Sequence, residues 1–85
     1  TNPTHYAVAI QYKEGTDAPV VVAKGVDHLA QQIKKVAREN EVHIIQNPPL
    51  ARSLYAEVEI DKPIPKALFG AVAEVLAYVS KMNQK

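Results

Sequence analysis

The chain has 85 residues, of which 47% are hydrophobic and 22% are charged, so it is long enough for one small globular domain and too apolar for a disordered segment. Ten Lys and Arg residues against nine Asp and Glu residues give a net charge of +1, which argues against a nucleic-acid binder that neutralises phosphates. Cysteine is absent and no apolar run approaches the ~18 residues of a membrane span, so we expect no disulfide framework, no thiolate zinc site and no spanning segment.

The first five residues, Thr1 to His5, are the most informative part of the chain. Asparagine favours the first position of a β-turn and proline the second, so residues 2–5 are predicted to form one turn. Pro3 has no backbone N–H, which blocks the usual deamidation of Asn2. One intramolecular route remains, in which the Asn2 side-chain amide attacks the Asn2 backbone carbonyl, closes a five-membered imide and expels the Pro3 nitrogen. An ordinary Asn-Pro turn is the alternative, and these residues alone favour it.

The histidine of this segment has two possible roles. His5 could deprotonate the Asn2 amide or protonate the Pro3 nitrogen, because imidazole is a common general acid and base in proteins. Equally, it could form only a hydrogen bond that holds the turn, and both interpretations stay open. His28 and His43 share no metal-ligand spacing with His5, so the sequence predicts neither a metal nor a cofactor.

The hydrophobic pattern predicts alternating strands and helices. Alternation at Tyr6, Val8 and Ile10 indicates a strand, and the β-branched run at 18–24 indicates a second strand that Gly25 ends. Helical spacing follows over 26–40, with a third strand at 42–46. The apolar face of the helix is predicted to hold Val26, Leu29, Ala30, Ile33, Val36 and Ala37.

The second half of the chain starts with a clear helix signal. Asn47 suits the N-cap position and Pro48 the first helical position. A short strand at 57–60, a stiff loop at 61–65 and a last helix from Pro65 to Met82 are expected after it. Together these elements predict an α/β fold, a small mixed sheet of about four strands packed with helices. A strand that begins behind a turn at residue 5 also implies a preceding strand, supplied by an upstream segment or a second polypeptide.

Three segments together resemble the cytoplasmic domain of the FlhB/YscU family, the export-switch proteins of flagellar and virulence type III secretion. They are NPTHYAVAIQY at 2–12, APVVVAKG at 18–25, and PPLARSLY at 48–55 followed by IPKALFGAVAEVLAYV at 64–79. The match covers nearly the whole chain, and the first two segments look more like the flagellar branch than the virulence branch.

The resemblance implies a single domain over residues 1–85, with a cleavage turn at 1–5 and a downstream fragment at 6–85. The site would consist of Asn2, Pro3, Thr4 and His5, and would cut the chain once, without turnover. The resemblance also implies that the two fragments stay associated and that the parent protein sits in the bacterial inner membrane. Cleavage would then let the export apparatus change from rod and hook substrates to filament substrates, triggered by a hook-length ruler protein.

A second candidate site lies in the PPLARSLY segment. Its residues would contact export substrates or other apparatus subunits, although Leu50 and Tyr55 are also typical core residues and Arg52 a typical surface residue. The full candidate set is Pro49, Leu50, Ala51, Arg52 and Tyr55. Two other functions are weighed against the export switch: a stand-alone homologue that only binds export components, and a small nucleic-acid-binding module, which the near-neutral charge disfavours.

Overall fold

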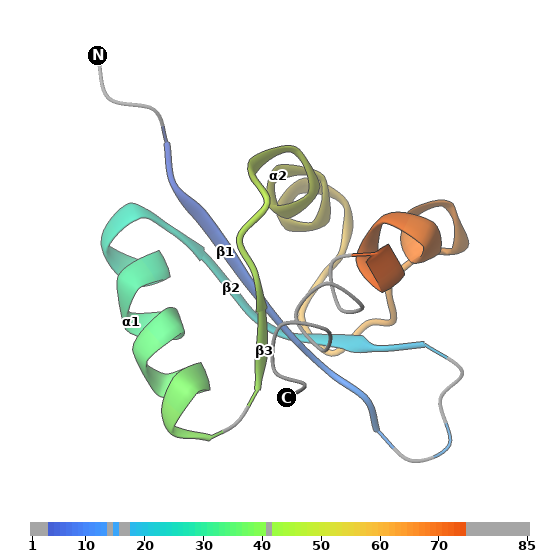
Figure 1. Cartoon of the computed structure of the whole chain (residues 1–85), viewed down its shortest axis with the longest axis horizontal. Coiled ribbons are helices and arrows are strands. Elements are labelled where there is room, and N and C mark those ends of the chain that lie inside the picture. The colour runs from blue at the N-terminus through green and yellow to red at the C-terminus, as the bar shows by residue number, and fades with distance from the viewer. Residues whose placement is uncertain (1–3, 14, 16–17, 41, 75–85) are drawn as a thin grey trace, which may run out of the picture.

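The computed structural model describes residues 4–13, 15, 18–40 and 42–74, and these form a small α/β fold around a three-stranded sheet (Figure 1). The elements are β1 (Tyr6–Gln11), β2 (Val20–Val26), α1 (Asp27–Glu39), β3 (His43–Ile45), α2 (Pro48–Glu57) and the 3-10 helix η1 (Lys66–Leu68). Residues 69–74 continue from η1 as α-helix. The expected α/β class is therefore confirmed.

Strand β1 lies at the centre of the sheet, in the order β2-β1-β3, and pairs antiparallel with both neighbours. Its residues from Ala7 to Ile10 are between 0% and 3% exposed, because helices cover both faces of the sheet. Successive side chains of a strand point to opposite faces, so Val8 and Ile10 pack in the core beneath α2 while Ala9 faces α1. The alternation of large and small residues in the sequence thus reflects two different helix neighbours.

The main core fills the space between the sheet and α2. It brings together side chains from all three strands, from α2 and from the segment after it. The buried members are Val8, Ile10, Val21, Ile45, Leu50, Ala51, Leu54, Val58, Ile64 and Val72. Tyr6, Tyr55 and Leu68 are partly buried at its margin.

Helix α2 begins as predicted. The Asn47 side-chain oxygen accepts a hydrogen bond from the Leu50 backbone N–H at 3.2 Å, and Pro48 is the first helical residue. The expected strand at 57–60 is wrong, because α2 continues through Glu57 and residues 60–61 form a turn. Ala56 and Glu57 are good helix formers, which favours this extension.

The chain after α2 runs along the outer edge of β2 without forming a full strand. The Val21 N–H donates to the Lys62 carbonyl at 3.0 Å, and the Asp61 N–H donates to the Val21 carbonyl at 2.7 Å. An isolated antiparallel bridge joins Val20 to Pro63. The last helix then begins with η1 and is described to residue 74, so the remainder of the prediction to Met82 lies outside the described residues.

Gly25 does not end the second strand as predicted, since β2 continues to Val26. The glycine is instead a point of close approach between β2 and α1. A Cβ atom at this position would lie 2.6 Å from Leu29 Cγ and 2.8 Å from Ile33 Cδ1, closer than carbon atoms can pack. The Leu29 and Ile33 side chains of α1 therefore rest directly on the backbone of Gly25.

Gly25→Ala is expected to lower the free energy of unfolding by about 1–3 kcal/mol, because the Leu29 and Ile33 side chains must move to admit the methyl group. Denaturant unfolding followed by circular dichroism measures this. Gly70→Ala is the matched control, because a Cβ there meets nothing within 4 Å, and it should leave stability unchanged or raise it by about 0.5–1 kcal/mol. Equal stability of Gly25→Ala and the unmodified chain would contradict the close packing.

Candidate functional site

The predicted cleavage turn leads directly into the central strand. Thr4 and His5 are exposed and adjoin the first residue of β1, next to the start of α1 (Figure 1). Asn2 and Pro3 lie outside the described residues. The downstream arm of the turn is thus joined to the most deeply buried strand of the domain.

His5 is held by the first residue of α1. The Asp27 backbone N–H donates to the His5 carbonyl at 2.8 Å, and the His5 backbone N–H donates to Asp27 Oδ1 at 3.0 Å. Asp27 is also an acid in the first turn of α1, which suits the positive end of the helix dipole. Its contact with His5 depends on the register of β1 against β2, which the sequence alone does not state.

The second candidate set divides between core and surface. Leu50 is 7% exposed and Ala51 0%, so both are enclosed in the main core and are not open to a partner. Pro49 and Arg52 are exposed, and Tyr55 is half-buried. The surface that α2 offers to a partner is consequently smaller than the sequence set suggested.

Lys24 and Tyr55 together connect the three segments that carry the family resemblance. Its Nζ donates to the carbonyls of Tyr55 and Val58, both at 2.9 Å, and lies 5.3 Å from the centre of the Tyr55 ring. These carbonyls are at the end of α2, where the helix has no partners of its own for them. The Tyr55 ring meets Tyr6 edge to face at 5.3 Å. The sequence analysis did not predict a role for this lysine, although it is the one charged residue within an apolar strand.

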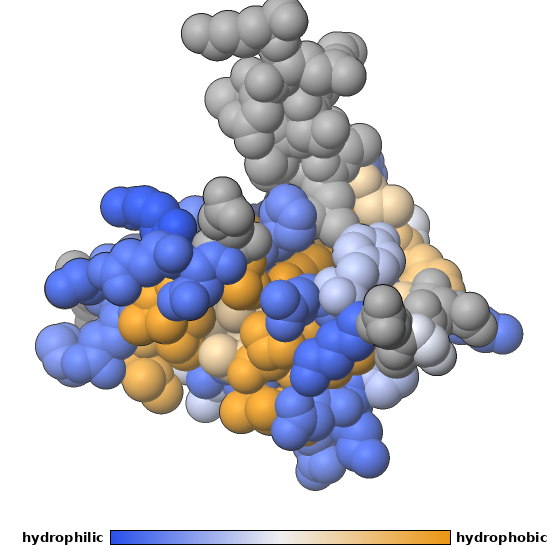
Figure 2. Space-filling model, turned by 90° about the horizontal axis from the view of Figure 1, so that it is seen from below, coloured by the Kyte–Doolittle hydropathy of each residue, from blue (hydrophilic) through white to orange (hydrophobic). Residues whose placement is uncertain are grey.

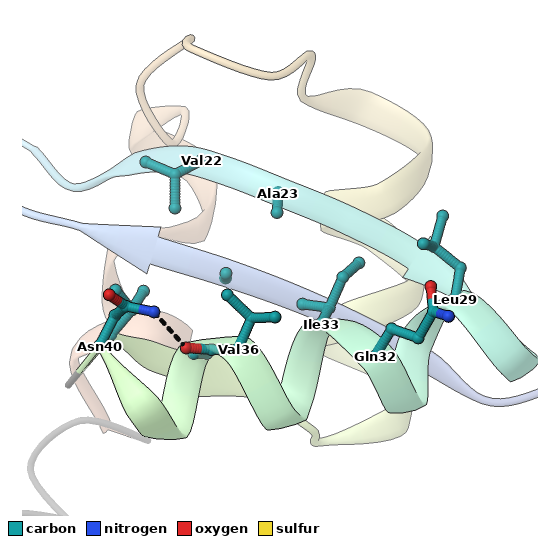
Figure 3. A pocket seen from close by; sticks show the side chains of 10 residues that line it. Val22, Ala23, Leu29, Gln32, Ile33, Val36 and Asn40 are labelled. Carbon is teal, nitrogen blue, oxygen red and sulfur yellow. Dashed lines mark hydrogen bonds between the residues drawn. The ribbon is translucent and has the colours of Figure 1, made fainter.

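An apolar groove lies between α1 and the sheet, with a volume of about 450 Å³ (Figure 3). Leu29 and Val36, which we predicted to be buried, are 50% and 56% exposed along it. The buried residues of α1 are Ala30 and Ala37, while Leu29 rests part of its side chain on Gly25 and leaves the rest open to the groove. The wall on the sheet side comes from Ala9, Val22 and Ala23. Figure 2 shows hydrophobic side chains gathered between hydrophilic ones on one face of the molecule.

Within the described part of the chain, no group of His, Cys, Asp and Glu side chains is arranged to hold a metal ion. Nor does any helix among the described residues have the length and hydrophobicity to cross a membrane.

The fold and the site define a small α/β domain in which an Asn-Pro-Thr-His segment precedes the central strand and a PPLARSLY helix packs on the sheet. The chain belongs to the FlhB HrpN YscU SpaS family, whose sequence profile matches residues 1–79. The resemblance found in the sequence is therefore confirmed.

The relatives include flagellar proteins of two distant bacteria. The flagellar biosynthetic protein FlhB of Bacillus subtilis is 57% identical over 86 residues, and that of Helicobacter pylori is 54% identical over 85 residues. In both comparisons all of this chain is matched, but it spans only 24% of the relative. The flagellar branch expected from the sequence agrees with these matches.

Two solved structures show the same fold. The cytoplasmic domain of FlhB from Shewanella putrefaciens is 50% identical, with a TM-score of 0.82 over 94% of this chain and 66% of that one. The PscU C-terminal domain is 40% identical, with a TM-score of 0.76 over 91% of this chain and 99% of that one.

Lys24→Met is expected to lower the free energy of unfolding by about 1–3 kcal/mol, because it removes two charge-assisted hydrogen bonds from the end of α2 and keeps the aliphatic stem. Lys35→Met, on the exposed side of α1, is the control and should stay within about 0.5 kcal/mol of the unmodified chain. Chemical denaturation measures both. If the two variants were equally stable, Lys24 would not hold α2 in place.

Proposed function

We propose that this chain is the cytoplasmic domain of a flagellar protein-export component that cuts itself once, between Asn2 and Pro3. The observation that carries the proposal is the direct connection of the Asn-Pro-Thr-His segment to a strand that is buried on both faces. A rigid attachment on the downstream side limits the conformations of the turn. Holding a nucleophile and its target close together accelerates a reaction by several orders of magnitude.

The proposed reaction needs no outside reagent until its last step. The Asn2 side-chain nitrogen forms a bond to the Asn2 carbonyl carbon and gives up a proton. The bond from that carbon to the Pro3 nitrogen breaks, and the nitrogen leaves as a secondary amine after gaining a proton. Water then opens the cyclic imide at the end of the upstream fragment. Pro3 favours this course, because it provides no backbone N–H for the competing deamidation.

The exposure of Thr4 and His5 supports access of water to the site. An exposed imidazole can exchange protons with solvent, which suits the proposed proton transfers to or from His5. The same residue is fixed through its backbone by Asp27, which suits the alternative of a purely conformational role. Both roles remain compatible with the proposal.

After cleavage the domain would act as a docking and switching module at the cytoplasmic face of the bacterial inner membrane. Its partners would be the upstream fragment, other apparatus subunits, the hook-length ruler protein and the export substrates. Cleavage would permit the change from rod and hook substrates to filament substrates. The exposed Pro49 and Arg52 on α2 support a contact with one of these proteins, and nothing in the near-neutral charge calls for nucleic acid.

The chain contains an internal control for the chemistry, a second Asn-Pro pair at Asn47-Pro48. There the side-chain oxygen of Asn47 accepts from Leu50 N–H, and its carbonyl accepts from Ala51 N–H at 2.7 Å. The N-cap bond thus fixes the side-chain amide of Asn47 through its oxygen and restricts the approach of its nitrogen to the carbonyl carbon. The bond between Asn47 and Pro48 should remain intact.

A chain extended upstream of Thr1 by the matching residues of the Bacillus subtilis relative should therefore yield two fragments without any added protease, and Asn2→Ala should yield none. Intact-mass measurement during incubation at neutral pH follows both. Asn47→Ala is the control variant and should still be cut at Pro3, with stability lowered by about 0.5–2 kcal/mol through loss of the N-cap. A single uncut species after prolonged incubation would refute self-cleavage.

The open edges of the sheet indicate where the upstream strand would bind. Residues 61–63 already occupy part of the outer edge of β2, whereas β3 is an edge strand with no further neighbour among the described strands. A strand added beside β3 would complete its hydrogen bonds and cover an exposed edge.

The two fragments should therefore elute together in size-exclusion chromatography of the cleaved protein under native conditions. Addition of denaturant should separate them, because hydrogen bonds and apolar contacts, not a covalent bond, would join them. Two separate peaks in native buffer would contradict the association.

A further inference from the structure

The hydrogen-bonded ladder between β1 and β2 continues one residue beyond its last backbone pair. Tyr6 is paired with Val26, so the next residues in register are His5 and Asp27. In a hydrogen-bonded antiparallel pair, two residues each donate an N–H to the carbonyl of the other. Asp27 donates to the His5 carbonyl in this way at 2.8 Å. The return bond from His5, at 3.0 Å, is accepted by the Asp27 side chain in place of its carbonyl.

The backbone explains why the Asp27 side chain accepts this bond in place of the Asp27 carbonyl. Asp27 has a φ of +48°, in the left-handed region, and is the first residue of α1. The chain therefore leaves the sheet at Asp27, and its carbonyl belongs to the helix. Glycine, asparagine and aspartate are the residues that tolerate this backbone most readily. Of these, only asparagine and aspartate also place an acceptor oxygen two bonds beyond Cβ.

We propose that Asp27 is a positioning residue for self-cleavage, because its carboxylate extends the sheet to His5 and fixes the downstream arm of the turn. This inference rests on the proposed function. Without the carboxylate, His5 keeps only the bond that its carbonyl accepts from the residue 27 N–H, and its own N–H, on the side of the residue nearer to Asn2, is no longer held. A looser arm populates the geometry for imide closure less often, which lowers the rate.

A general structural role for Asp27 makes different predictions. An acid in the first turn stabilises a helix through its dipole, and that effect depends on charge and changes the stability of α1. The positioning role depends on an acceptor oxygen at the right place and changes the cleavage rate. Asn retains the acceptor without the charge, and Gly retains the backbone conformation without the acceptor.

The test compares Asp27→Asn and Asp27→Gly in the upstream-extended chain, by intact mass against time. Loss of a charge-assisted hydrogen bond corresponds to a cleavage rate about tenfold lower in Asp27→Gly, while Asp27→Asn should stay within about threefold of the unmodified chain. Glu39→Gln, at the other end of α1, controls for loss of an acidic charge. Thermal unfolding shows that each variant is folded.

Hydrogen exchange of the His5 amide, measured by NMR, provides a readout that does not depend on cleavage. Exchange should be faster in Asp27→Gly and close to normal in Asp27→Asn. If the unmodified extended chain were never cut, self-cleavage and the positioning role would both be overturned. If it were cut and Asp27→Gly were cut equally fast, only the positioning role would be overturned. An Asp27→Asn variant as slow as Asp27→Gly would assign the effect to charge and also overturn it.

Discussion

The rest of the structure depends on the double coverage of β1. This strand is hydrogen-bonded along both edges, and its residues from Ala7 to Ile10 are enclosed by helices on both faces. Small side chains let α1 approach one face, while Val8 and Ile10 form the base of the main core beneath α2. Because a central strand of this kind opens only with the whole domain, whatever is attached to its first residue has a fixed origin. The candidate cleavage turn is attached there.

Two side-chain contacts connect the sheet to the candidate functional segments. Asp27 holds His5 at the beginning of the strand, and Lys24 holds the end of α2 two residues before the end of β2. Both residues come from the same short stretch of chain around Gly25, which is itself shaped by the close approach of Leu29. The junction between β2 and α1 thus contacts both candidate segments: it holds His5, which follows the proposed cleavage site, and it holds the end of α2. A change in this junction is expected to affect both.

The sequence correctly predicted those features of the fold that depend on neighbouring residues in the chain. The N-cap at Asn47, the alternation in β1 and the α/β class were all confirmed, because each depends on residues close together in the chain. Gly25 was misjudged because its role comes from helix side chains packed on it, and the exposure of Leu29 because the buried positions of α1 are held by Ala30 and Ala37. The residue types show that cyclisation at Asn2 and Pro3 is possible, but it is the family resemblance that favours it over an ordinary turn. The contact of Asp27 with His5 could not be predicted, because it depends on strand register and an unusual φ.

The central claim is that the side chain of Asn2 itself breaks the chain. The most direct measurement is the mass of the carboxyl end of the upstream fragment, taken early in the reaction at mildly acidic pH and again with hydroxylamine present. Cyclisation predicts a fragment one water lighter than the free acid, which hydroxylamine converts to a hydroxamate. A fragment that ends in unmodified asparagine from the earliest time, with no hydroxamate, would contradict the account.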